Sequence, residues 1–119
     1  MKIEIHQSGK IEDTNRLTIV AYSNGSTKSL MITAKDKKSI QSVFRKIGQP
    51  KLFIYKLFAV AIFILIKDNL NKIEQIIIDR EYPGYENLIK DFICQIAQKN
   101  QIKIDRKNIV FSINLRLIH

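Results

Sequence analysis

Apolar and polar residues alternate in the first third of the chain, which is the pattern of half-buried strands. At residues 2–6, two isoleucines point to one side and Lys2, Glu4 and His6 point to the other. The sequence Ser-Asn-Gly-Ser at 23–26 is a strong turn signal between two further apolar stretches. We therefore expect an antiparallel meander of three strands, at residues 2–6, 17–22 and 28–33.

Helical spacing replaces this alternation in the middle of the chain. Residues 35–47 carry apolar side chains three and four positions apart on one side and basic side chains on the other. Residues 52–66 are apolar apart from Lys56, but they fall short of the roughly 20 residues that cross a bilayer as a helix. This stretch predicts a helix buried in the centre of a domain, and no membrane partner is expected.

The second half of the chain alternates strand and helix signals. The run Ile-Ile-Ile within residues 72–79 is typical of a strand with both faces covered, and Pro83 and Gly84 break the pattern after it. Helical spacing follows at 85–100. A last strand is expected at 108–115.

This order of elements predicts an α/β protein with a mixed, five-stranded sheet. The connections stay short and the crossovers right-handed if the first strand lies at the sheet centre beside the fourth. The chain has 119 residues, of which 45% are hydrophobic, and this is enough to bury one core. A single domain over 1–119 is therefore expected.

The chain is strongly basic, with 20 Lys and Arg residues against 11 Asp and Glu residues and a net charge of +9. Such a charge attracts polyanions, so nucleic acid, either DNA or RNA, is the leading partner. The alternative is a composition set by genome bias or growth temperature. Basic side chains cluster in one region, which is a candidate nucleic-acid-binding patch or, alternatively, a solvated helix face. The cluster consists of Lys35, Lys37, Lys38, Arg45, Lys46 and Lys51.

Cysteine and histidine are scarce. The one cysteine, Cys94, falls within the apolar spacing of a predicted helix and is expected to be a small buried residue. The two histidines, His6 and His119, are too few for a zinc site and are interpreted as surface residues. Charged residues near the amino terminus do not fit a secretion signal, so a cytoplasmic location is expected.

Acidic residues gather where the predicted fourth strand ends. Asp79 and Glu81 stand at this end, Glu86 follows in the next helix, and Glu4 lies on the first strand. These four carboxylates are the candidate catalytic groups, and Asp79 and Glu4 are the candidate metal ligands. In the alternative interpretation, Asp79 and Glu81 solvate or cap the turn, and Glu4 pairs across strands with a lysine such as Lys28.

Two tyrosines, Tyr82 and Tyr85, flank the Pro-Gly turn after this strand. Tyrosine rings beside a basic surface are suited to stacking on nucleic-acid bases. A packing lid over the turn is the alternative interpretation, and it is the more common role of tyrosine in such a position.

The order of the elements resembles the ribonuclease H-like fold over nearly the whole chain. The sequence Ile-His-Gln-Ser-Gly at 5–9 is also similar to the Asp-Glu-Ser-Gly that opens one uncharacterised family of presumed nucleases of this type, with His6 in place of the first aspartate. The resemblance implies phosphodiester hydrolysis by two Mg²⁺ or Mn²⁺ ions about 4 Å apart, held by converging carboxylates.

The same resemblance implies roles for particular acids. Asp79 occupies the end of the fourth strand, where such nucleases carry one ligand, and Glu4, Glu81 and Glu86 are the residues left to complete the site. The helices expected at 35–47 and 52–66 offer no acid beyond Asp36, so the carboxylate set is incomplete.

Two functions are therefore expected. The first is a nucleic-acid-binding protein related to ribonuclease H-like metal-dependent nucleases, which either cleaves phosphodiesters or has kept the fold and lost the acids. The second is a non-enzymatic protein-interaction module or a homodimer.

Overall fold

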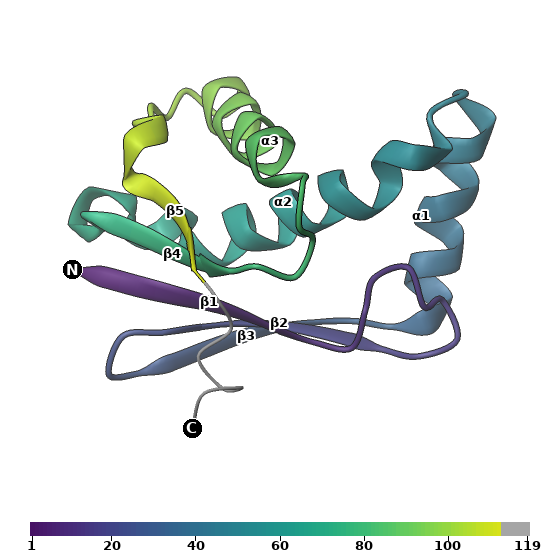
Figure 1. The fold of residues 1–119 in the computed structure, drawn as a ribbon, viewed down its shortest axis with the longest axis horizontal. Coiled ribbons are helices and arrows are strands. Elements are labelled where there is room, and N and C mark those ends of the chain that lie inside the picture. Colours follow the sequence, from purple (N-terminus) through teal and green to yellow (C-terminus); the bar gives the residue numbers. More distant parts are fainter. Residues whose placement is uncertain (113–119) are drawn as a thin grey trace.

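The computed structural model describes residues 1–112 of the chain, in which five strands form one sheet and three α-helices accompany it (Figure 1). Most strands and helices lie within two residues of the stretches predicted from the sequence. The strands are β1 (Lys2–Ser8), β2 (Thr18–Ser23), β3 (Thr27–Ile32), β4 (Gln75–Asp79) and β5 (Ile109–Ser112), and the helices are α1 (Ala34–Lys46), α2 (Phe53–Ile66) and α3 (Glu86–Lys99).

The strands are arranged in the order β3-β2-β1-β4-β5. β1 runs antiparallel to β2 and parallel to β4, and β5 runs parallel to β4. Parallel neighbours need a crossover connection, which α3 supplies between β4 and β5. The predictions of a mixed five-stranded sheet in an α/β protein, and of the first strand at its centre beside the fourth, are confirmed.

One face of the sheet packs against the helices. Alternate residues such as Ile3 and Ile5 of β1 and Ile76 and Ile78 of β4 are at most 1% exposed, and α2 and α3 lie above them (Figure 1). α2 is the central helix that its apolar sequence predicts, because eight of its residues are buried. In residues 1–112, no helix combines the length and apolar character needed to span a membrane.

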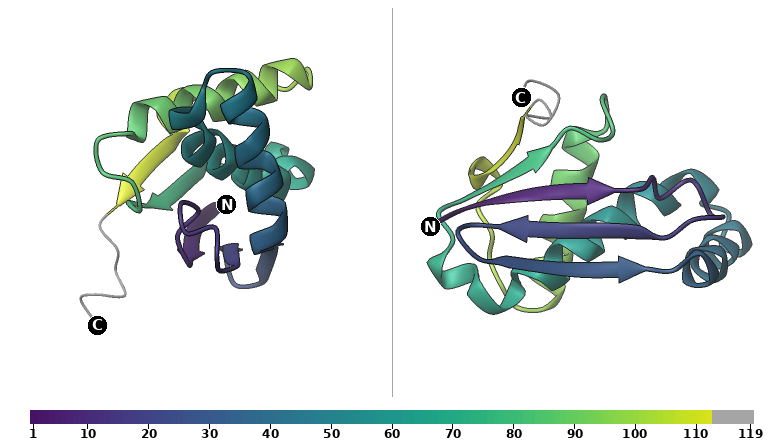
Figure 2. Two further views of the ribbon diagram at one scale, coloured as in Figure 1. Left: turned by 90° about the vertical axis from the view of Figure 1, so that its right-hand side faces the viewer. Right: turned by 90° about the horizontal axis from the view of Figure 1, so that it is seen from below.

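The opposite face of the sheet is less covered. Seen from below, β1, β2 and β3 lie in front of the helices (Figure 2). Ile77 of β4 is only half-buried on this side, so the expectation that both faces of the fourth strand are fully covered is wrong at this residue. This less covered face, called the open face below, carries Glu4, His6 and Asp79.

The predicted boundaries fail mainly at short 3₁₀ turns. Residues Lys67–Lys72 form such a turn, so β4 begins at Gln75 rather than at 72. Another turn, Pro50–Leu52, precedes α2. Residues 113–115 of the predicted last strand, and His119, lie outside the described residues.

The loop between β1 and β2 folds back over the end of the sheet. Gly9 begins it with a φ of +77°, and a Cβ atom there would lie 2.5 Å from the carbonyl oxygen of Leu17. Ile11 is fully buried, and its backbone N–H donates to the hydroxyl of Tyr82 at 3.3 Å. The loop is therefore a packed part of the domain.

Candidate functional site

Three ionisable side chains meet on the open face at the two central strands. The register pairs Glu4 with Ile77, which brings the next outward residues of these strands, His6 and Asp79, beside one another. His6 Nδ1 lies 2.8 Å from Asp79 Oδ2, and His6 Nε2 lies 3.4 Å from Glu4 Oε2. Glu4 and Asp79 were predicted as site residues, and the structure brings both of them to the same imidazole ring, that of His6.

Exposure increases outward along this triad of Asp79, His6 and Glu4. The side chain of Asp79 is 4% exposed, that of His6 26% and that of Glu4 45%. Asp79 is therefore the buried end of the triad, and Glu4 is the end that solvent reaches. His6 is half-buried and paired, which corrects its interpretation as a simple surface residue.

The imidazole separates the two predicted metal ligands, since Glu4 and Asp79 contact different nitrogens of the same ring. Within residues 1–112, no group of three or more histidine, cysteine, aspartate or glutamate side chains is arranged to hold a metal ion.

The other two predicted catalytic acids have different surroundings. Glu86 pairs with Arg80, with 3.3 Å between Oε1 and Nε, so its charge is balanced outside the triad. Glu81 is half-buried, and its backbone N–H donates to the carbonyl oxygen of Asp79 at 2.9 Å. This contact tightens the turn after β4.

The alternative partner predicted for Glu4 is also wrong. Glu4 lies opposite Ser23 on β2, whereas Lys28 lies opposite Tyr22, so Glu4 and Lys28 belong to different faces of the sheet. Lys28 Nζ lies 3.7 Å from Asp68 instead.

A pocket of about 340 Å³ adjoins the triad at Glu4. It lies on the open face between β1, the turn after β2 and β4. Its lining is mostly polar and includes one cation and one carboxylate, and consists of Lys2, Glu4, Ser23, Asn24, Gly25 and Ile77. A small polar group would fit this lining better than an apolar one.

The two tyrosines of the Pro-Gly turn have different roles. Tyr82 is buried, at 8% exposure, and its hydroxyl accepts a hydrogen bond from Gln7 Nε2 at 2.8 Å. Burial raises the pKa of Tyr82 to about 12, although the hydrogen bonds from Gln7 and Ile11 act in the opposite direction. Tyr82 is thus the packing lid, whereas Tyr85 is 45% exposed and stacks on Tyr55 of α2.

The predicted basic patch loses one member, because Lys37 is fully buried. Its ammonium donates to the carbonyl oxygens of Lys10 and Asp13, at 3.1 and 2.6 Å, and to Thr18 Oγ1 at 3.0 Å. Burial lowers the pKa of Lys37, and the nearby Asp13 and Glu12 raise it by less. Lys37 holds the β1–β2 loop and cannot reach a ligand on the surface.

The other members of the patch are exposed. Four of them lie along one side of α1, and the fifth lies in the 3₁₀ turn that follows. Within the described part of the chain none of the five takes part in an ion pair. These residues, called the basic face below, are Lys35, Lys38, Arg45, Lys46 and Lys51.

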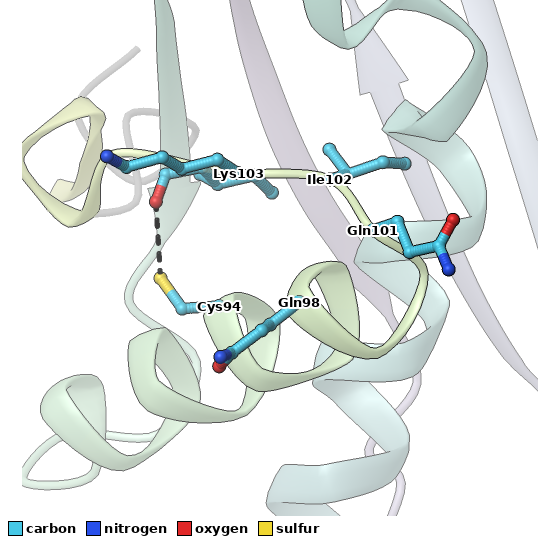
Figure 3. Close-up of a pocket in the computed structure, with 6 residues that line it drawn as sticks. Cys94, Gln98, Gln101, Ile102 and Lys103 are labelled. Atoms are coloured by element: carbon cyan, nitrogen blue, oxygen red, sulfur yellow. Dashed lines mark hydrogen bonds between the residues drawn. The ribbon is translucent and has the colours of Figure 1, made fainter.

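A pocket that includes the thiol of Cys94 lies at the carboxyl-terminal end of α3. It has a volume of about 450 Å³ and is lined by Cys94, Gln98 and residues 101–104 (Figure 3). Cys94 is half-buried, and its Sγ points to the carbonyl oxygen of Ile104 at 3.9 Å. Burial raises the pKa of this thiol, which disfavours the nucleophilic thiolate and agrees with a packing role.

Comparison of the chain with protein-family models, with curated proteins and with solved structures finds no match. Three features of the described residues are candidates for a functional role: the basic face, the triad on the open face, and the stacked pair of Tyr55 and Tyr85. Tyr55 is the member that sequence patterns do not indicate, since it lies within an almost wholly apolar stretch.

Proposed function

We propose that this chain is a nucleic-acid-binding domain with a ribonuclease H-like sheet, and that the basic face contacts the phosphate backbone. The proposal rests on the placement of charge along α1. Lys35, Lys38, Arg45 and Lys46 are all exposed, whereas the partly buried Ile40 and Phe44 lie on the other side of the helix and pack against the core. Four cations on one helix face, without neutralising partners among the described residues, suit phosphate groups better than a neutral ligand.

The order of the strands supports the proposal of a ribonuclease H-like sheet. A three-stranded antiparallel meander, with its first strand central and parallel to two later strands, is the arrangement expected of ribonuclease H-like domains. Asp79 stands at the end of β4, where such nucleases carry an acid, but His6 holds it at 2.8 Å. We infer that binding, rather than two-ion cleavage, is the retained activity.

The binding proposal is tested by fluorescence anisotropy with labelled single- and double-stranded DNA and RNA, at salt concentrations from about 50 to 200 mM. The test variant replaces Lys35, Lys38, Arg45 and Lys46 with serine. We expect it to bind duplex DNA more weakly, and the slope of log K against log salt to fall by about 0.9 for each phosphate that these side chains neutralise in the wild type.

A matched control removes the same charge elsewhere, by serine substitution of the exposed Lys67, Lys72, Lys99 and Lys107. Net attraction alone would make the two quadruple variants equal, and this result would contradict a specific role of the basic face. Failure of the wild-type chain to bind any of the probes at low salt would contradict the proposal as a whole.

A protein-interaction role is the second candidate, because apolar side chains are exposed around a groove between β3, α1 and α2. Met31 and Ile64 line this groove and are 60% and 40% exposed, and the groove has a volume of about 340 Å³. A homodimer through this surface would be detected by sedimentation velocity, and Ile64→Glu should then return the protein to the monomer.

A further inference from the structure

A pair of stacked tyrosines stands at the surface where α2 and α3 begin. The rings of Tyr55 and Tyr85 are nearly parallel, at 13°, and their centroids are 4.1 Å apart. The buried Tyr82 packs edge-on against Tyr55 with a centroid distance of 5.8 Å and against Phe58 at 5.4 Å. Tyr85 is therefore an exposed ring supported from below by other aromatic rings, which fix its plane.

A pocket of about 240 Å³ lies beside this pair, and its lining is apolar except for one cation. It is smaller than the pockets of about 300–1000 Å³ that enclose drug-sized ligands, and a single flat ring system is the size of occupant that suits it. The lining residues are Lys51, Leu52, Ile54, Tyr55, Tyr85 and Leu88. Lys51 is exposed and belongs to the basic face.

The pocket lies next to the basic face, at the end of α1. The 3₁₀ turn that carries Lys51 is tied to the end of α1, because Gln49 donates from its backbone N–H to the carbonyl oxygen of Phe44 at 2.9 Å. The end of α1 and the beginning of α2 lie side by side in the ribbon views (Figures 1 and 2). A strand of nucleic acid that follows the cations of α1 would thus reach Tyr85 next.

We propose that Tyr85, supported by Tyr55, is a stacking platform for one base of a single-stranded nucleic acid, with Lys51 holding an adjacent phosphate. This inference rests on the proposed nucleic-acid binding and adds the form of the ligand. A base can stack on a protein ring only when its face is free, as in a single strand. An apolar pocket bordered by one cation matches the two parts of a nucleotide, the flat base and the anionic phosphate.

Tyrosine fluorescence tests the proposal directly, because the chain has four tyrosines and no tryptophan. The probe is a thymidine oligonucleotide of about 12 nucleotides, within the range of site sizes of single-strand-binding domains. We expect the probe to quench the tyrosine emission. Tyr85→Ala should weaken binding by about 5- to 150-fold, which corresponds to about 1–3 kcal/mol for one stacked base, whereas Tyr85→Phe should bind as the wild type does.

Three controls separate stacking from other effects. Leu17→Ala removes an exposed apolar side chain just before β2 and should leave binding unchanged. Tyr85→Ala should not alter the affinity for duplex DNA of the same length. Lys51→Ser should lower the salt slope for the single strand by about 0.7, and circular dichroism confirms that each variant is folded.

The outcomes distinguish this inference from the proposed function. If Tyr85→Ala binds the oligonucleotide as tightly as the wild type, while the quadruple serine variant of the basic face loses affinity, the stacking platform is refuted and the nucleic-acid-binding function stands. If the wild-type chain binds neither single strand nor duplex at low salt, the function itself is refuted, and the platform with it.

Discussion

Lys37 joins α1 to the β1–β2 loop and to β2 through three hydrogen bonds of its ammonium. The substitution Lys37→Met keeps most of the apolar stem in its buried position but removes all three hydrogen bonds of the ammonium. Two of the acceptors are backbone carbonyl oxygens of the loop, and the third is the hydroxyl of Thr18, which is itself fully buried.

The size of the effect follows from two opposing contributions. A hydrogen bond to a charged group contributes about 1.5–3 kcal/mol, so three such bonds are worth several kcal/mol. Burial of the ammonium opposes them, as the lowered pKa of Lys37 indicates, and the freed carbonyl groups can turn towards water. We expect the free energy of unfolding to fall by about 3 kcal/mol, which corresponds to a decrease of about 10 °C in Tm for a chain of this size.

Urea denaturation followed by circular dichroism at the helix band measures this change. Lys38→Met is the matched control, because Lys38 is the next residue of α1 and is exposed, and it should change the free energy of unfolding by less than about 0.5 kcal/mol. If the two variants were equally stable, the cost of burying the ammonium would equal the gain from its hydrogen bonds, and the role assigned to Lys37 would be refuted.

Three further predictions concern the pH range of stability, the backbone and the triad. The pKa of Tyr82 is about 12 in the folded protein, whereas the ordinary value for tyrosine is 10.0. The contribution of this shift to the free energy of unfolding is therefore complete below pH 10 and is lost as the pH rises from 10 to 12, and it amounts to about 3 kcal/mol at about 1.4 kcal/mol per pKa unit. Tyr82→Phe should flatten the fall in unfolding free energy measured over this range. Gly9→Ala should destabilise the domain by at least about 1 kcal/mol more than Gly25→Ala in thermal unfolding, because both glycines have a positive φ but only Gly9 would place its Cβ against a backbone oxygen; equal losses would contradict this. His6→Asp should place two carboxylates side by side, and their repulsion should lower Tm in the absence of metal. Added Mn²⁺ should restore Tm, and calorimetry that detects no Mn²⁺ binding to this variant would count against the comparison with metal-dependent nucleases.

The sheet could be predicted from the sequence because its signals are local. Alternation at β1 and the turn sequence before β3 mark the meander, and the triple isoleucine marks β4. The pairing of β1 with β4 follows from rules of connection rather than from any single residue. Boundaries were missed where a 3₁₀ turn, such as Lys67–Lys72, takes up polar residues beside an apolar strand.

The contacts of the candidate site were harder to predict because they join residues far apart in the sequence. His6 and Asp79 are 73 positions apart, and only the sheet register brings them together. The burial of Lys37 did leave a local signal: Lys37, Ile40 and Phe44 have the spacing of one helix face, so this lysine belongs to the apolar side of α1 and not to the basic one. Lys37 was grouped with the basic residues because of its charge, although its spacing places it on the apolar side of the helix.

The central place of the first strand has a consequence for how the chain folds during synthesis. One edge of β1 pairs with β2, which follows after the loop at residues 9–17, so the meander can form early. The other edge can pair only with Gln75–Asp79, which leave the ribosome after both α1 and α2 have been made. Until then, the nascent chain exposes the unpaired backbone of its most central strand, together with the apolar helix that should cover it. This is the interval in which aggregation or chaperone binding competes with folding.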